Sequence, residues 1–188
     1  MNNKVTYGLK NVHYAVFDER SESYLTPIPL KGAAELKLSS VDEVKETDIY
    51  SSSGLPILYF STNRGYEGSL LLSVVPEHFY INCLGQQKKS ANDVLVESDH
   101  DVHSSFALLF EFDGDQNKTR HILYRCYATR PSVSSTSRGG SMDISGQEMS
   151  LRVLSTLEDG KIKAKVNNTG TEPSKTIYEN WFNEVQIF

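Results

Sequence analysis

The chain has 188 residues and a formal net charge of −5 at pH 7, with ten tyrosines and eight phenylalanines. The length fits a single domain, 1–188, and the aromatic content favours pleated sheets over helices, so we predict a mostly β fold. The acidic balance argues against a surface that grips nucleic acid, and no run approaches the roughly 20 apolar residues that span a bilayer.

The first forty residues predict strands of different exposure. Residues 5–17 alternate loosely between apolar and polar types, which predicts a first strand. In 24–30 two prolines on alternate positions remove ladder donors, so this segment belongs at a sheet edge or in an ordered loop. Residues 34–39 alternate strictly, as a half-exposed strand does.

The segment at about 42–62 predicts an arm. It has an acidic first part, a Ser51-Ser52-Ser53-Gly54 hinge and an apolar second part. Two short strands around the hinge would form a projecting hairpin, whose apolar limb another surface must cover, because large exposed apolar patches mark interfaces. The alternative is that this limb is another core strand.

A helix is expected after a strong strand at 66–75. Pro76 suits the first helical turn, Glu77 suits the positive end of the helix dipole, and Gly85 can adopt the left-handed conformation that closes a helix. We therefore predict one short α-helix at about 76–84, packed on a sheet.

The stretch 105–130 is the centre of the predicted fold. Two alternating apolar runs flank a polar turn at 113–118, which predicts a β-hairpin. The opposite faces are also partly apolar, so the hairpin should lie in a sheet with cover on both sides. The residues expected to share a face within each strand are Phe106, Leu108, Phe110 and Phe112, and Ile122, Tyr124, Cys126 and Ala128.

A polar linker is predicted at 86–103, and it contains one arrangement that suggests a metal. Strand spacing would put Asp99, Asp101 and His103 on one side, and imidazole and carboxylate are good metal ligands. A solvated linker explains the cluster Asp99–His103 equally well. We expect no metal site.

No feature of the sequence makes a case for an enzyme or a cofactor. Residues 113–117 begin like a calcium loop, but the glycine and glutamate that such a loop needs are missing, so a turn is expected. Nucleotide-binding and nucleophile motifs are also missing. Cys83 and Cys126 lie in apolar stretches and are expected to be buried thiols.

The C-terminal part predicts a loop, a hairpin and a docked tail. The small polar residues of about 132–146 cannot build a core, so they form a flexible loop. Strands at 149–153 and 162–166 are expected to pair through an Asp159-Gly160 turn. The lysines of the second strand keep an edge soluble or meet phosphate, and the aromatic tail 176–188 packs on the body.

Several segments, in their order and spacing, resemble the major tail tube protein family of long-tailed, non-contractile bacteriophages of Gram-positive hosts. The region 48–61 departs from the family pattern. The segments that carry the resemblance are 5–17, 24–32, 65–85 (GYEGSLLLSVVPEHFYINCLG), 106–115 (FALLFEFDGD), 124–131 (YRCYATRP), 157–166 (LEDGKIKAKV) and 180–185 (NWFNEV).

The resemblance implies a β-sandwich or barrel-like tail tube fold with one short helix and extended loops or arms. It also implies a structural virion protein, assembled in the host cytoplasm as stacked hexameric rings that form the conduit for genome ejection. Its partners would be copies of itself and other tail proteins (tape measure, distal tail and terminator), with DNA passing through unbound and no membrane contact. Our candidates for subunit contacts are Leu55, Ile57, Leu58, Tyr59, Phe60 and Arg138.

Two other functions remain open from the sequence. The chain could be a monomeric β-sandwich that binds carbohydrate or a receptor through its tyrosines and Trp181. It could also be an enzyme with a dispersed metal site at 99–103. Rings or tubes, glycan affinity or a bound metal would distinguish the three.

Overall fold

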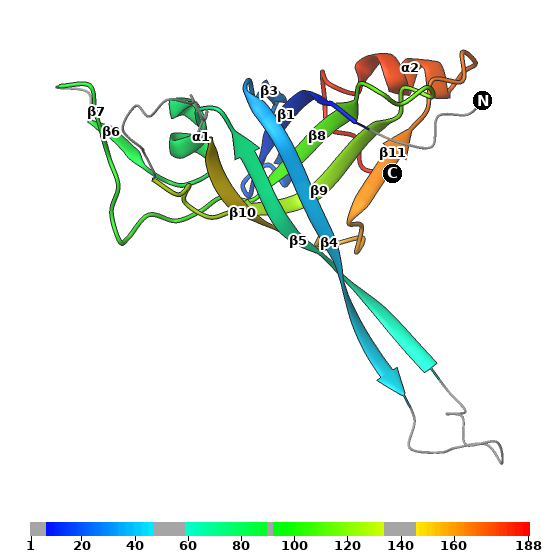
Figure 1. The fold of residues 1–188 in the computed structure, drawn as a ribbon, viewed down its shortest axis with the longest axis horizontal. Helices are drawn as coiled ribbons and strands as arrows, with labels where there is room; N and C mark the ends of the chain where they lie inside the picture. The colour runs from blue at the N-terminus through cyan, green and yellow to red at the C-terminus, as the bar shows by residue number, and fades with distance from the viewer. Residues whose placement is uncertain (1–6, 47–58, 90–91, 134–145) are drawn as a thin grey trace, which may run out of the picture.

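A nine-stranded antiparallel sheet forms the body of the protein in the computed structural model, which describes residues 7–46, 59–89, 92–133 and 146–188 (Figure 1). The strands run in the order β2-β1-β8-β9-β10-β5-β4, with β3 paired to β1 and β11 paired to β9. The sheet contains β1 (Leu9–Asp18), β2 (Ser23–Tyr24), β3 (Ile28–Pro29), β4 (Ala33–Glu46), β5 (Tyr59–Leu72), β8 (Phe106–Phe112), β9 (Arg120–Ala128), β10 (Gln147–Val153) and β11 (Lys163–Val166).

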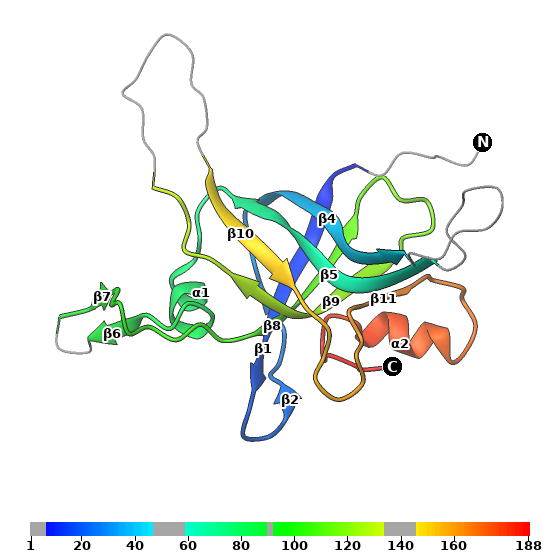
Figure 2. The same ribbon diagram turned by 90° about the horizontal axis from the view of Figure 1, so that it is seen from below.

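A second, two-stranded sheet pairs β6 (Gln87–Lys89) with β7 (Val94–Val96), within the segment predicted as a polar linker. The helices are α1 (Glu77–Asn82) and α2 (Ser174–Asn180), which lie on either side of β1 and β8 in the view of Figure 2. The mostly β class and the helix at 76–84 are confirmed, whereas the expectation of a single helix is wrong.

The sheet curls around a core that α1 fills. Strands β1 and β4, which lie far apart in the strand order, contact each other. Phe79 of α1 is fully buried and packs edge-on against Tyr14 and Phe106, with ring centroids 5.0 and 5.4 Å away. Both free cysteines are buried, and Cys83 belongs to this core. Helix α1 therefore fills the interior of a barrel-like body.

A second apolar cluster lies on the outer face of β1, β8 and β9. The C-terminal segment covers this face, with Trp181 packed on Ala107, Leu109 and Tyr124. The indole Nε1 of Trp181 donates a hydrogen bond of 3.2 Å to the carbonyl oxygen of His121. The aromatic tail thus docks on the body, and its first part is the helix that the sequence pattern did not predict.

A β-bulge in β9 corrects the predicted faces of the central hairpin. The ladder pairs Phe106 with Cys126 but Leu108 with Leu123, so β9 has one extra residue between these pairs. As a result Ile122 and Tyr124 pack on the outer cluster, whereas Cys126 and Ala128 pack in the core. A strict alternation through all four positions is wrong, because a single inserted residue exchanges the two faces.

The predicted C-terminal hairpin is also wrong. Strands β10 and β11 do not pair with each other but lie one after the other along the same edge of β9. β10 pairs with residues 126–128 and β11 with residues 120–123, so the bulge separates the two partners. The connection between them contains the expected turn, with Gly160 at φ +67°.

Candidate assembly interface

The longest hairpin of the protein extends well beyond the body. β4 and β5 pair over their whole length, from Ala33–Leu72 to Glu46–Tyr59. β10 covers the other edge of β5 only from Tyr66 to Leu72. Beyond Tyr66, β4 and β5 therefore continue as a two-stranded ribbon that projects from the sheet (Figure 1). We call residues 42–46 and 59–64 the distal hairpin.

Two local features direct the distal hairpin away from the body. Gly65 has φ +96°, and a Cβ atom there would lie 1.9 Å from the carbonyl oxygen of Val153. The ladder pairs Ser40 with Tyr66 but Asp42 with Asn63, so β5 has one extra residue here, which indicates a β-bulge next to Gly65. The Asn63 side chain accepts a hydrogen bond of 2.9 Å from the Gly65 amide. A glycine is needed here because β5 leaves β10 at this point.

The side chains of the distal hairpin have no core of their own. Val44 and Phe60 are 47% and 58% exposed. Glu43 forms an ion pair of 3.1 Å with Lys45 and a second one with Arg64. The Arg64 hydrogen bond, followed by that of Lys45, lowers the pKa of Glu43. Because an isolated two-stranded hairpin is marginally stable in water, this element is expected to gain cover from another molecule.

The predicted contact residues are only partly placed. Phe60 lies exposed on the distal hairpin and Tyr59 is the first residue of β5. Leu55, Ile57, Leu58 and Arg138 lie outside the described residues, as do most of the predicted arm and of the predicted loop at 132–146. Sequence reasoning missed Val44, although its place between Glu43 and Lys45 in an alternating strand is the signal of an apolar side chain that needs cover.

Four strands of the sheet, β2, β3, β4 and β11, have a single pairing partner within the described chain, and β4 and β11 are the longest of them. Among the described residues, β4 pairs only with β5, and β11 only with β9. Between β11 and the base of the distal hairpin lies a hollow of about 380 Å³, lined by Asn63, Tyr66 and Lys163 among others. The ammonium group of Lys163 lies 5.4 Å from the centre of the Tyr66 ring. Unpaired edges are templates for strands of another chain.

The Asp99–His103 cluster does not converge on a common point. The carboxylate of Asp101 accepts a hydrogen bond of 2.9 Å from the Ser98 amide, and the His103 ring lies 3.0 Å from the carbonyl oxygen of Ala128. Asp99 and its neighbour His100 are both exposed. Within the described part of the chain, no group of three or more His, Cys, Asp or Glu residues could hold a metal ion.

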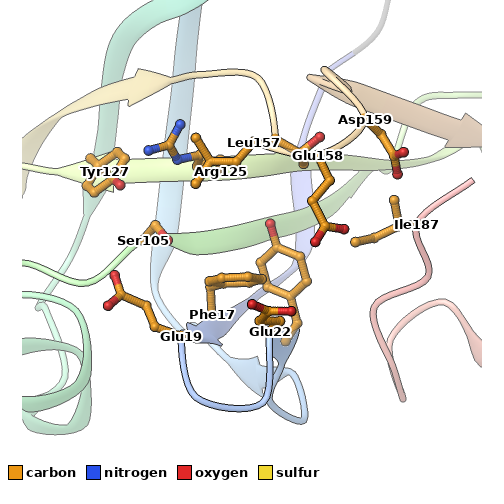
Figure 3. Close-up of a pocket in the computed structure, with 12 residues that line it drawn as sticks. Phe17, Glu19, Glu22, Ser105, Arg125, Tyr127, Leu157, Glu158, Asp159 and Ile187 are labelled. Carbon is orange, nitrogen blue, oxygen red and sulfur yellow. The ribbon is translucent and has the colours of Figure 1, made fainter.

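A pocket of about 310 Å³ lies between the β1–β2 turn and the β10–β11 connection (Figure 3). Phe17 and Tyr24 pack edge-on at 5.1 Å and form an aromatic wall. Arg125 enters from β9, and its guanidinium lies 5.8 Å from the Tyr127 ring. The carboxylates at the rim are those of Glu19, Glu22, Glu158 and Asp159. No predicted site residue lies here.

The aromatic residues that could have held a sugar differ in exposure: Tyr7 is 62% exposed, whereas several others are buried. Tyr14 and Tyr124 are inaccessible, and burial raises the pKa of each to about 12. Trp181 is 4% exposed. The described part of the chain contains no helix that is long and apolar enough to cross a membrane.

No protein-family model matches the chain, and no curated protein matches it. Among solved structures, the chain is similar to the anti-feeding prophage cap, described as the AFP tube terminating cap, which was determined by cryo-electron microscopy. The TM-score is 0.38 and the sequence identity 12%, over 89% of this chain and 96% of that chain. A TM-score of this size is too low to establish a shared fold.

Proposed function

We propose that this protein is a structural virion protein whose copies polymerise as stacked, hexameric rings into the tail tube of a long-tailed bacteriophage, the conduit for genome ejection. The distal hairpin is the single observation that carries this proposal. It presents Val44 and Phe60 to solvent on a ribbon without a core, which is expected of an element that contacts a second molecule.

The free edges of β4 and β11 support the same function. Each can accept a strand from another copy, and closing the copies into a ring would pair edges that a single subunit leaves open. The order of the sequence segments that resemble the tail tube family supports the choice of a tube over another ring. We also expect contacts with the tape measure, distal tail and terminator proteins at the ends of the tube.

For the alternative function, a sugar-binding module, Trp181 is not available to a ligand. Sugar recognition needs an accessible aromatic face, whereas Trp181 is packed on the sheet and donates its N–H to the backbone. Tyr127, at the edge of the Figure 3 pocket, is half-buried next to Arg125.

Electron microscopy of the purified, concentrated protein tests the proposal, with rings or tubes as the expected result. The double variant Val44→Glu/Phe60→Glu should abolish assembly, because two charges would be buried in the contact. Its unfolding free energy should stay within about 0.5 kcal/mol of wild type, since both side chains are exposed in the subunit.

Val102→Glu is the matched control, because Val102 is an apolar residue 80% exposed on the loop between β7 and β8, which is not part of the distal hairpin. It should assemble like the wild type. A wild-type protein that stays monomeric at every concentration and salt condition would refute the tube. Normal tubes from the double variant would instead refute the role of the distal hairpin.

A further inference from the structure

One half of the sheet has a polar outer face that no described element buries. Strands β4, β5 and β10 lie side by side in register, so that outward-facing residues form rows across them. None of these side chains is buried. We call this set the open face, and it consists of Glu35, Lys37, Ser39, Glu67, Ser69, Leu71, Glu148, Ser150 and Arg152.

The open face contrasts with the outer face of β1, β8 and β9. There the C-terminal segment covers apolar residues such as Leu109 and Ile122. On the open face the middle row consists of one lysine and two serines, with Lys37 opposite Ser69 and Ser69 opposite Ser150. A polar face of this extent is suited to water or to a hydrophilic molecule that passes close by.

The charges of the open face are arranged so that they do not hold phosphate. The Lys37 ammonium lies 2.8 Å from Glu35, whose hydrogen bond raises the pKa of Lys37. The Arg152 guanidinium pairs with Glu67 at 2.5 Å. Glu148 adds a third carboxylate, so both cations have acidic partners and one carboxylate is left over. A surface without spare cations releases few counterions on contact with DNA and binds it weakly.

The β11 strand has the opposite character. Lys163 and Lys165 have no carboxylate within ion-pair distance among the described residues, and both lie on a strand edge. Such lysines would attract the phosphates of a nucleic acid at close range. Of these two surfaces, only the open face would let DNA slide.

From this contrast we infer that the open face of β4, β5 and β10 lines the channel and faces the DNA in the assembled tube. The inference rests on the proposed function, because it needs a tube to line. It places the C-terminal segment, which covers the other half of the sheet, away from the channel wall formed by the open face.

Thiol labelling of assembled tubes tests the assignment. Both native cysteines are buried, so a cysteine introduced by Ser150→Cys is the reactive group of the subunit. A small maleimide should label this thiol in tubes, whereas a maleimide on a polymer wider than the channel should not enter. We expect the polymer reaction to slow by roughly tenfold or more on assembly, because access controls thiol reactivity.

Each labelling result either supports or overturns the assignment of the open face to the channel. Reaction with both reagents in tubes would place the open face on the outside, and reaction with neither would place it in a subunit contact; either result overturns the inference while the tube stands. If wild-type protein forms no tubes, the proposed function fails first and the inference falls with it. Ser69→Cys, in the same row, repeats the test if Ser150→Cys does not assemble.

Discussion

The body and the distal hairpin belong to one sheet but differ in what stabilises them. In β8 the side chains of both faces are buried, either in the core or under the C-terminal segment. In the distal hairpin no described side chain is buried, although β4 and β5 stay paired beyond the bulge at its base. Backbone pairing alone thus extends a strand beyond its core, and the body should set the stability of the subunit while the hairpin serves assembly.

The largest predicted loss of stability comes from a substitution in the core of the body. Phe79→Ala removes a fully buried ring between Tyr14 and Phe106, and we expect a loss of about 3–5 kcal/mol in unfolding free energy. Urea denaturation of the unassembled protein measures it. Phe60→Ala is the matched control and should cost less than about 0.5 kcal/mol. Equal losses at the two positions would show that the hairpin is part of the folded core.

The junction of the two regions provides the next largest effect. Gly65→Ala forces a Cβ atom against the Val153 carbonyl at a positive φ, and should cost roughly 3 kcal/mol. Gly160→Ala is the control, because Gly160 also has a positive φ but open space around it, and should cost about 1 kcal/mol. Denaturation midpoints compare them. A smaller loss at Gly65 would mean that the hairpin leaves the body without this constraint.

A substitution at Arg120 should weaken the packing of the C-terminal segment on the body. The guanidinium of Arg120 lies 3.8 Å from the centre of the Tyr178 ring and 3.4 Å from Glu111. Arg120→Ala should cost about 2 kcal/mol, because a largely desolvated carboxylate loses its cation. Trp181 is the only tryptophan, so its fluorescence should shift to longer wavelength as the segment loosens. An unchanged spectrum at unchanged stability would contradict this.

The smallest effect we predict is a pH dependence of the body. Burial, and then the positive charges of Lys163 and Lys165, lower the pKa of His121 below its ordinary value of 6.5. Below pH 6.5 the unfolded chain takes up this proton more readily than the folded one, so stability falls as the pH drops from 7 to 5. His121→Gln should flatten that fall, and exposed His100→Gln should not. Unfolding midpoints at both pH values check the sign.

The sequence predicted the elements whose pattern is local. The apolar alternation of 106–112 and the Pro76 and Gly85 signals correctly located β8 and α1, because each depends on neighbouring residues. The exchange of faces in β9 could not be predicted, since the inserted residue shows itself only against the register of β8. Likewise, the Asp159-Gly160 turn suited a hairpin, but pairing with β9 prevailed over pairing between β10 and β11.

The candidate interface was predicted only in part, for a related reason. Phe60 was identified from its apolar surroundings, but which residues project depends on where β10 stops covering β5. The pairing that holds the open face in register joins β10 to a strand far away in sequence, which no local pattern reveals.

The end-to-end arrangement of β10 and β11 on β9 has a practical consequence for engineering. β10 and β11 each have their register fixed by their own ladder with β9. The connection between them can therefore change in length without shifting either strand. Its tip at Leu157–Gly160 is exposed, and a Cβ atom at Gly160 would meet nothing within 4 Å. Exposed tips of this kind accept extra residues. An epitope or affinity peptide spliced in at this tip should leave both strands where they are.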